Sequence, residues 1–570
     1  MPQRCFSGTH TAPAASLFTS MKTLPNPLYY LENFHLVLDW IRSRYSDLLI
    51  EDELAWIDRF SAMPQNARAL LVRFVMRKGN LFRSGKLVYD EIGCPHEAAC
   101  ALVAAGWVDA DPLLDPDLLY GLLKKAELLE LLKPYRPSAS AKKTDLLDLL
   151  HEAFPEPVSF GRLHPESTER IYRLSDKVEK LCRRLRLMFF GNPYQDWTEF
   201  VLADLGIYLY EKVRIDDESR GFRRREDVDA YLHLHALRER FDAGEEAEII
   251  LRELGEPAID NEWIAGRRAK FLYQIAQFHE QRGELSLAMD LYRQCRYPGA
   301  RLRCVRIHEK TGDHHAAYAL AQSAEEAPEN EAERQQLERI LPRLRRKLGL
   351  PKNPIVSAKI FEEWTLILPR PEQDYSVEME VCRLLSTDNP PVYYVENAMI
   401  NSLFGLLCWD AIFHPMPGAF FHPFHTGPAD LHAPDFYTRR KELFDACFSQ
   451  LDSDAYKTAI RKRFTEKSGR QSPFVFWGAL DEEMLELALD CIPADHLRHW
   501  FNRVLQDIKS NRNGFPDLIQ FWPQEGRYRM IEVKAPGDRL QDNQLRMLDF
   551  AIRHGMPVSV CYVVWSEPAT

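Results

Sequence analysis

The segment that most constrains this chain lies near its C-terminus, where two apolar, β-prone stretches flank a short polar turn. The stretches are residues 517–522 and 528–535, and the turn between them contains Pro-Gln-Glu-Gly at 523–526. β-Branched and aromatic residues on either side of turn-forming residues are typical of two paired strands. The sequence therefore predicts a β-hairpin here.

Three charged side chains of this predicted hairpin are placed so that they can meet. Asp517 begins the first strand, and Glu532 and Lys534 lie two residues apart on the second strand. Because alternate side chains of a strand share a face, Glu532 and Lys534 project together. Ile531 and Val533 then face the other way. Asp517 opens the partner strand, so we expect its carboxylate to lie close to that of Glu532.

This arrangement of charge suits a particular chemistry. Two carboxylates that meet at one point repel each other unless a cation lies between them. Mg²⁺ fits such a site because it takes oxygen ligands and keeps waters and substrate oxygens in its shell. The bound ion polarises a phosphate and lowers the pKa of a bound water. Lys534 could orient that water or stabilise the transition state, so the hairpin indicates hydrolysis of a phosphodiester.

The residues after the hairpin predict a helix over 540–553 and a buried strand over 557–565. Gln544 falls on the apolar stripe of that helix and needs a polar partner, which the active site would supply. Pro-Asp and Glu-x-Lys are each common, and a hairpin can carry them as solvated surface charge. Together, in the order strand, turn, strand, helix and strand, they favour a nuclease.

The whole pattern resembles the PD-(D/E)xK nucleases, specifically their VRR-NUC domain, and the chain resembles a bacterial form of the Fanconi-associated nuclease family. Two other segments match, Leu-Tyr-Tyr-Leu-Glu-Asn-Phe at 28–34 and Leu-Phe-Gly-Leu-Leu-Cys-Trp-Asp-Ala-Ile-Phe at 403–413. The resemblance therefore spans residues from about 25 to the C-terminus. It implies a hydrolase of the phosphodiesterase I type that cuts 5′ flaps and branched DNA, acts as a 5′-to-3′ exonuclease and serves interstrand crosslink repair.

A third carboxylate belongs to a predicted helix over residues 395–413. Glu396 shares a stripe with Ile400 and Leu403 at the N-terminal end of that helix. Such a carboxylate is costly unless it is paired or binds metal, but an acidic residue in a first turn is also favoured by the helix dipole. The residues leave both open, and the resemblance implies metal contact. Asp410 is expected to be structural or exposed.

Residues and resemblance together predict the set of groups at the site and its cofactor. The metal would be Mg²⁺ or Mn²⁺. Its ligands would be Asp517, Glu532, Glu396 and the Val533 carbonyl, and the catalytic residues Asp517, Glu532, Lys534 and Gln544.

Length, charge and cysteine content set outer limits. A chain of 570 residues suggests about three or four domains. A net charge of −11 argues against a protein that coats nucleic acid nonspecifically, but a DNA enzyme can gather its basic residues on one face. The eleven cysteines have no CxxC spacing and suit a reducing compartment. The ubiquitin-binding zinc finger of eukaryotic family members has no counterpart cluster.

No apolar run reaches transmembrane length, and the first twenty residues lack the apolar stretch of a signal peptide. We therefore expect a cytoplasmic, nucleoid-associated bacterial protein without a membrane partner. Met21 is an alternative start. The long helical region before the nuclease motif favours a monomer.

The rest of the chain predicts mostly α structure in several modules. These are a disordered N-terminus at 1–24, a helical DNA-binding domain at 25–115, a SAP-like module at 116–155, a helical linker with tetratricopeptide-like repeats at 156–354, and an α/β nuclease domain at 355–570. The SAP-like module predicts two helices, Leu122–Leu132 and Thr144–Phe154. Basic residues of the first two modules would contact DNA, with a solvated helical face as the alternative. They are Arg73, Arg77, Lys78, Lys124, Lys125, Lys142 and Lys143.

The repeats are indicated by one motif that occurs twice. His279 begins His-Glu-Gln-Arg-Gly-Glu and His308 begins His-Glu-Lys-Thr-Gly-Asp. Each unit predicts helix, glycine-containing turn and helix, and we expect the two histidines to pack within the repeats. The His- and Phe-rich residues 414–435 could form a zinc site, but their spacing favours a packed aromatic loop.

Two alternatives to a flap nuclease are a four-way junction resolvase and a nonenzymatic DNA-binding helical scaffold with a degenerate nuclease fold. The intact Asp, Glu and Lys set argues against the scaffold. Family members that capture a 5′ phosphate use a basic pocket. Residues that could contribute to one are Arg301, Arg303, Arg306, Lys509 and Arg512.

Overall fold

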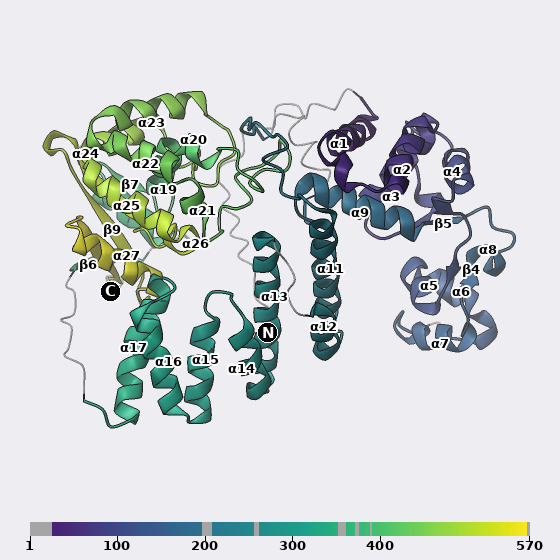
Figure 1. Ribbon diagram of the computed structural model, residues 1–570, viewed down its shortest axis with the longest axis horizontal. Coiled ribbons are helices and arrows are strands. Elements are labelled where there is room, and N and C mark those ends of the chain that lie inside the picture. Colours follow the sequence, from purple (N-terminus) through teal and green to yellow (C-terminus); the bar gives the residue numbers. More distant parts are fainter. Residues whose placement is uncertain are drawn as a thin grey trace. The chain divides into compact units, whose positions relative to one another are not determined.

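The computed structural model describes residues 26–138, 140–195, 208–255, 261–351, 361–370, 376–387 and 390–566. The predicted disordered N-terminus and the alternative start at Met21 lie outside the described residues. The chain divides into two compact units, residues 1–208 and 209–570, which are considered separately. Helices predominate in both, and the second unit ends in a mixed sheet, so the predicted fold class is confirmed (Figure 1).

The first unit begins with helices that pack through apolar stripes. They are α1 (Tyr29–Tyr45), α2 (Glu51–Ala62), α3 (Gln65–Met76), α4 (Pro95–Ala104) and α9 (Asp176–Phe190). In α1 the buried residues Phe34, Leu38 and Ile41 recur at helical spacing and form one face. The short helices expected over 25–115 are therefore present.

A small antiparallel sheet in the first unit was not predicted. Its strand order is β1 (Leu81–Arg83), β5 (Ile171–Leu174) and β2 (Val108–Asp109). The strands are two to four residues long, and the central strand follows the others by more than sixty residues. Local sequence patterns cannot predict such a pairing, because it depends on contacts between distant segments.

The SAP-like module has three helices where the sequence predicted two. They are α5 (Pro116–Leu122), α6 (Lys125–Leu131) and α7 (Asp145–Ala153), followed by α8 (Phe160–Leu163), and a strand pair of β3 (Leu113–Leu114) and β4 (Val158–Ser159) closes the module. The predicted helix Leu122–Leu132 is wrong at its start, because the chain is extended at Leu123 and Lys124. Thr144 precedes α7 but its side chain makes no capping hydrogen bond.

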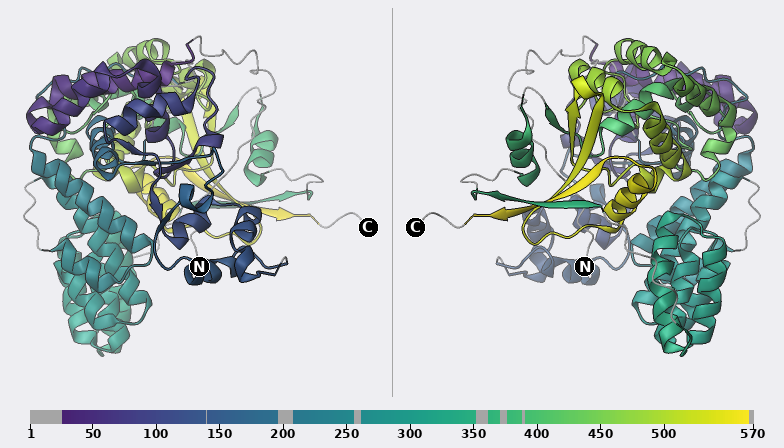
Figure 2. Two further views of the ribbon diagram at one scale, coloured as in Figure 1. Left: turned by 90° about the vertical axis from the view of Figure 1, so that its right-hand side faces the viewer. Right: turned by 90° about the vertical axis from the view of Figure 1, so that its left-hand side faces the viewer.

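The second unit begins with an array of helices that pack in sequence order. They are α11 (Arg225–Asp242), α12 (Ala247–Leu254), α13 (Glu262–Gln281), α14 (Leu285–Gln294), α15 (Ala300–Thr311), α16 (His314–Glu326) and α17 (Glu331–Lys347). Figure 2 shows α13–α17 as neighbouring teal helices. Ala288 and Ala317 occupy equivalent buried positions, which confirms the repeat.

The two repeat histidines have a packing role, as expected. His279 is buried and its Nδ1 contacts Glu284 at 2.5 Å. The Nδ1 of His308 lies 3.6 Å from Asp313, at the same offset in the next repeat. Each histidine therefore contacts the acid that follows its glycine turn.

The C-terminal part is built on a five-stranded mixed sheet. Its order is β6 (Glu362–Leu368), β10 (Val558–Trp565), β9 (Arg527–Lys534), β8 (Leu518–Trp522) and β7 (Val392–Tyr394). β10 pairs parallel to both β6 and β9, whereas β8 is antiparallel to β9 and β7. The predicted hairpin and the last strand are thereby confirmed. Figure 2 shows the pairing of β6 with β10 as a teal strand beside a yellow one.

Helices cover both faces of this sheet. They are α18 (Val377–Leu385), α19 (Met399–Leu407), α20 (Trp409–Ile412), α21 (Phe436–Arg439), α22 (Lys441–Ser449), α23 (Ala455–Glu466), α24 (Glu482–Cys491), α25 (Ala494–Gln506), α26 (Ile508–Asn511) and α27 (Asp542–Arg553). The larger core joins the sheet to α19, α25 and α27. α18 packs on Ile531 and Val533, so these residues do face away from Glu532 as predicted.

The predicted helix over 395–413 is wrong at its start and in its interior. Helix α19 begins only at Met399, and a break at Cys408 separates it from α20. The backbone N–H groups of Val395 and Glu396 both donate to the Asp517 carbonyl, at 2.8 and 2.9 Å. Because these bonds join the segment to β8, Glu396 precedes the helix and has a left-handed φ of 33°.

No helix within the described residues combines the length and apolar character needed to cross a membrane.

Candidate active site

The hairpin brings Asp517, Glu532 and Lys534 together as predicted. Asp517 immediately precedes β8, and its Oδ2 accepts a hydrogen bond from the Val533 backbone N–H at 2.8 Å. On β9, the Lys534 Nζ donates to Oε1 of Glu532 at 2.6 Å. One strand therefore supplies a carboxylate and an ammonium group, and its backbone fixes the orientation of the second carboxylate.

Glu532 is the most deeply buried of these groups, with 1% of its surface exposed. Burial raises its pKa, and the nearby charge of Asp517 raises the pKa further. Burial also raises the pKa of Asp517, although the hydrogen bond from Val533 opposes that rise. Two carboxylates in this environment resist losing their protons unless a cation compensates them.

One oxygen of Glu532 has no partner. Its Oε1 accepts hydrogen bonds from Lys534 and from Gln544, whereas Oε2 is buried and receives no hydrogen bond from any described residue. A buried carboxylate oxygen without a donor is costly in a folded protein. A divalent metal would satisfy that oxygen, so the donor set fits such an ion.

Gln544 lies in the first turn of α27 and has the polar partner that its position required. Its Nε2 donates to Glu532 Oε1 at 2.5 Å, and its own Oε1 accepts from the Gln541 backbone N–H at 2.8 Å. The two bonds together fix which end of the amide points toward the carboxylate. The Gln544 side chain therefore joins the start of α27 to Glu532 of the candidate metal site.

Gly514 explains how the chain reaches this site. It has a φ of 87°, a left-handed conformation that favours glycine. A Cβ at this position would approach the backbone of Asn543 in α27 to 3.0 Å. The next residue, Phe515, donates its N–H to Oδ1 of Asn397 at 3.2 Å. The Gly-Phe-Pro-Asp segment therefore fits tightly between α27 and the turn that precedes α19.

Glu396 lies at the edge of the site but is held by other groups. The Tyr394 hydroxyl donates to its Oε2 at 2.7 Å, and the Asn397 Nδ2 donates to its Oε1 at 3.1 Å. Its charge nevertheless contributes to the raised pKa of Asp517. Among the described residues, no three His, Cys, Asp or Glu side chains already surround a common point as metal ligands would.

The sequence did not reveal Glu378, in the first turn of α18. Its charge raises the pKa of both Asp517 and Glu532, so it acts on the same site. Ser376 caps this helix by accepting from the Met379 N–H at 3.3 Å. A serine cap followed by acidic residues is common at helix starts. The sequence around Glu378 therefore did not distinguish a residue near a metal site from an ordinary helix start.

The basic residues predicted to contact DNA fall into two groups. Arg73 contacts Glu91 at 2.5 Å and lies over the Tyr30 ring, so its charge serves the fold. Lys143 is half-buried over the Tyr120 ring. The exposed members are Arg77, Lys78, Lys124, Lys125 and Lys142.

The five residues considered for a 5′-phosphate pocket each have a protein partner, and the pocket itself stays a prediction. Arg301 pairs with Glu333, and Arg303 pairs with Glu280, so both hold repeat helices together. The remaining three have separate contacts: Arg306 donates to Gln336, Lys509 reaches the Tyr297 hydroxyl at 3.5 Å, and Arg512 lies over the Phe474 ring.

The His-rich loop and Asp410 take the structural roles expected for them. His422 and His425 are buried with ring centroids 4.1 Å apart, and burial lowers the pKa of His425 to about 4. Their ring nitrogens accept hydrogen bonds from loop backbone N–H groups. Asp410 is largely exposed and pairs with Arg463. A packed aromatic loop is confirmed.

Comparison with known proteins assigns three domains along the chain. Residues 452–565 match the VRR-NUC domain, residues 28–109 match the domain described as FAN1, HTH domain, and residues 113–161 match the Fanconi anemia-associated nuclease SAP domain. Glu378 and Glu396 lie outside these matched ranges. The VRR-NUC match spans the hairpin and α27, and a nuclease of this PD-(D/E)xK type depends on a divalent metal.

Relatives align with nearly the whole chain. A Fanconi-associated nuclease 1 homolog of Pseudomonas aeruginosa is 53% identical over 557 residues, which cover 98% of this chain and 99% of the relative. The Arabidopsis thaliana homolog is 24% identical over 95% of this chain and 68% of its own length. A crystal structure of paFAN1 bound to a 2-nt 5′-flap DNA with a gap has a TM-score of 0.90 and 53% identity, covering 96% of this chain and all of that one. The chain therefore belongs to the Fanconi-associated nuclease family and is a DNA nuclease.

Proposed function

We propose that this protein is a structure-specific nuclease that cuts DNA at 5′ flaps with Mg²⁺ or Mn²⁺. One observation carries the proposal: the buried Glu532, whose Oε2 has no hydrogen-bond partner within the described ranges, lies beside Asp517 and Lys534. The choice of DNA is supported by the related structures, which hold 5′-flap DNA with a gap.

The metal would be held by Asp517 and Glu532, with Glu396 and the Val533 carbonyl completing the protein ligands. When bound, the ion polarises the scissile phosphate and lowers the pKa of a water. Glu396 would join after its side chain leaves the Tyr394 hydroxyl, which now donates to it at 2.7 Å. Glu378 adds negative charge near the same carboxylates and so favours a cation there.

Lys534 and Gln544 prepare the site for hydrolysis. Lys534 is buried and forms an ion pair with Glu532, so its ammonium group would lie beside a phosphate held at this site. There it would orient the attacking water and stabilise the charge that develops on phosphorus oxygens. In the reaction a water oxygen bonds to phosphorus, the bond to the leaving sugar oxygen breaks, and that oxygen takes up a proton. Gln544 keeps Glu532 in place throughout.

A 5′-to-3′ exonuclease activity and a role in interstrand crosslink repair belong to the same proposal. We also propose a monomer that acts at the bacterial nucleoid. Cleavage of DNA with flaps of increasing length, together with the mass of the protein in solution, would test these points.

The direct test is cleavage of a labelled 5′-flap DNA by the full chain and by Asp517→Asn. Asp410→Asn is the matched control, because Asp410 is an exposed acid paired with Arg463. We expect Asp517→Asn to bind the flap but to lose cleavage in Mg²⁺ and in Mn²⁺, and Asp410→Asn to cut normally. Full cleavage by Asp517→Asn would overturn the assignment. A four-way junction cut faster than the flap would favour a resolvase instead.

A further inference from the structure

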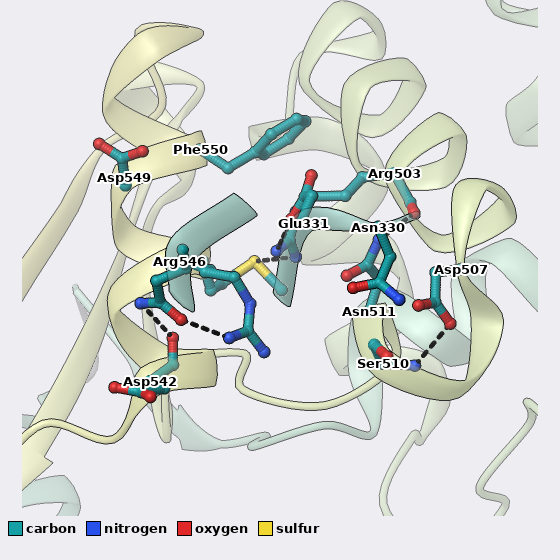
Figure 3. A network of polar contacts seen from close by, with 12 residues as sticks. Asn330, Glu331, Arg503, Asp507, Ser510, Asn511, Asp542, Arg546, Asp549 and Phe550 are labelled. Carbon is teal, nitrogen blue, oxygen red and sulfur yellow. Dashed lines mark hydrogen bonds and ion pairs between the residues drawn. The ribbon is translucent and has the colours of Figure 1, made fainter. Parts of the chain in front are cut away.

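The last helix of the repeat array, α17, makes a polar contact with the first turn of α27. The Arg339 guanidinium donates to both carboxylate oxygens of Asp542, at 2.6 and 2.8 Å. Gln335, one turn earlier in α17, donates to the Asp542 carbonyl at 3.2 Å and accepts from Arg546 at 2.5 Å. Three contacts therefore fix one helical turn from outside. Figure 3 shows two of them, at the Asp542 backbone carbonyl and at the Arg546 guanidinium.

A buried arginine also contacts α17 and α27, at the N-terminal end of α17. Arg503 of α25 has only 2% of its surface exposed. It donates to Glu331 of α17 at 2.8 Å and lies over the Phe550 ring of α27, with 5.1 Å between the guanidinium carbon and the ring centroid (Figure 3). A charge-assisted hydrogen bond of this kind is strongly directional. Because Arg503 holds α17 in place, the contact of Arg339 with Asp542 is made from a fixed position.

The first turn of α27 is also the turn that reaches the candidate metal site. Asp542 lies two residues before Gln544, whose amide donates to Glu532 Oε1. The same turn packs against Gly514 through Asn543. A shift of this turn would therefore move the Gln544 amide relative to the carboxylate that it holds. Small displacements of groups that orient a ligand carry large costs in metal sites.

We propose that α17 positions the catalytic centre: Arg339 and Gln335 hold the first turn of α27, and through it hold Gln544 against Glu532. Arg339 and Asp542 are positioning residues in this proposal, because they act on Glu532 only through the Gln544 amide. The repeat array is thereby a structural part of the nuclease site. This inference rests on the proposed role of Glu532 in metal binding.

A simple electrostatic role for Arg339 makes the opposite prediction. Removal of a positive charge near a cation site strengthens cation binding if the charge acts only through its field. Removal of a positioning contact weakens binding, since Glu532 is then held less well. The sign of the change in metal affinity therefore separates the two roles.

The test compares Arg339→Met with Arg343→Met in the full chain. Arg343 lies one turn later on α17 and pairs with Glu309 through two bonds of 2.6 and 2.8 Å, within the repeats. The two variants lose the same charge and the same number of bonds from one helix, but only Arg339 contacts α27. Mn²⁺ binding is measured by calorimetry without DNA, and kcat and KM are measured on a 5′-flap substrate.

We expect Arg339→Met to bind Mn²⁺ about three- to tenfold more weakly and to lose kcat by a similar factor, with KM for DNA unchanged. Asp542→Asn should show a similar loss, and the double variant should be no worse than either single one. The difference in Mn²⁺ affinity between the unaltered protein and Arg339→Met should become smaller as the salt concentration rises. Salt screens the Arg339–Asp542 ion pair, because both side chains are half exposed. Arg343→Met should bind and cut normally.

Two outcomes would overturn the inference. One is Arg339→Met that matches Arg343→Met in Mn²⁺ affinity and kcat. The other is tighter Mn²⁺ binding in Arg339→Met, which would assign it a field effect. If the unaltered protein binds no Mn²⁺ and cuts no flap, the proposed function itself fails, and that result is distinct from both.

Discussion

Two clusters in this protein each join one basic side chain to two carboxylates, yet the pKa values shift in opposite directions. In the first unit, Arg83 lies between Glu127 and Glu169. In the second unit, Lys534 lies beside Glu532, with Asp517 nearby. Glu378 and Glu396 add further negative charge to the second cluster.

The difference lies in how completely the carboxylates are satisfied. Arg83 donates four hydrogen bonds that reach both oxygens of each partner, and these bonds lower the pKa of Glu127 to about 2. Lys534 donates a single bond to Glu532. The second oxygen of Glu532 has no partner in the part of the chain that the structure describes, and burial raises the pKa of this carboxyl group. A satisfied cluster stabilises the fold, whereas an unsatisfied one is available to a ligand.

Glu532→Gln should produce the largest effect. Loss of a charged ligand should lower flap cleavage about a thousandfold or more, equivalent to about 4 kcal/mol of barrier. Flap assays at saturating Mg²⁺ measure this loss. Cleavage by Glu532→Gln within about tenfold of the unaltered protein would show that Glu532 is not a metal ligand.

Arg83→Met should destabilise the first unit by about 2–3 kcal/mol, because it leaves two partly buried carboxylates facing each other. Hydrogen exchange of the SAP-like module measures this loss directly. Glu169→Gln serves as the control, since it keeps the Arg83–Glu127 pair and should cost less. If Arg83→Met left the hydrogen-exchange protection of this module unchanged, the Arg83 cluster would not stabilise the fold as we propose.

The two clusters should respond oppositely to pH in the absence of metal. A raised pKa means that folded Glu532 binds a proton more tightly than it does unfolded, so its stabilising contribution falls as pH rises from about 4.5 through the raised value. Glu127 has a lowered pKa, so its contribution is present above about 4.5 and is lost as pH falls toward about 2. Each slope is at most about 1.4 kcal/mol per pH unit.

Unfolding free energies across pH 3 to 8 in a chelator measure these slopes. Glu532→Gln should reduce the fall in unfolding free energy as pH rises above about 4.5. It should leave the loss of unfolding free energy at acid pH unchanged. Glu127→Gln should do the reverse. If both variants change the unfolding free energy in the same pH range, the two pKa values are not shifted in opposite directions.

The smallest effects should come from exposed charges. Arg77 and Lys78 are exposed, so we expect Arg77→Gln with Lys78→Gln to leave unfolding free energy within about 0.5 kcal/mol. DNA affinity should fall by about two- to tenfold. The slope of the logarithm of affinity against the logarithm of salt concentration should become smaller by about one to two, which corresponds to one or two lost phosphate contacts. Fluorescence anisotropy at several salt concentrations measures both. An unchanged salt slope would place the DNA elsewhere.

The sequence revealed the parts of the site that depend on local patterns. Asp517, Glu532, Lys534 and Gln544 lie within one hairpin and the following helix, where strand alternation and the helical stripe determine which side chains meet. The roles of these residues are predictions that the assays above would test. Their placement, in contrast, is confirmed by the hydrogen bonds that join them.

The rest depends on contacts between distant segments. Glu378 reaches the site because α18 packs across β9, and Glu396 lies in a turn because its backbone bonds to residue 517. The contact between Arg339 and Asp542 joins residues about two hundred positions apart. Side-chain alternation and helical periodicity describe neighbours along the chain, so they carry no information on such pairs.

Proton release on metal binding tests most directly whether the buried carboxylates form the metal site. Mn²⁺ would be titrated into the metal-free protein by calorimetry in two buffers of different ionisation enthalpy. Because Glu532 and Asp517 have raised pKa values, binding near neutral pH should release protons, and Glu532→Gln should lose both the binding and the release. Binding of equal strength in Glu532→Gln, or binding without proton release in the unaltered protein, would contradict the assignment.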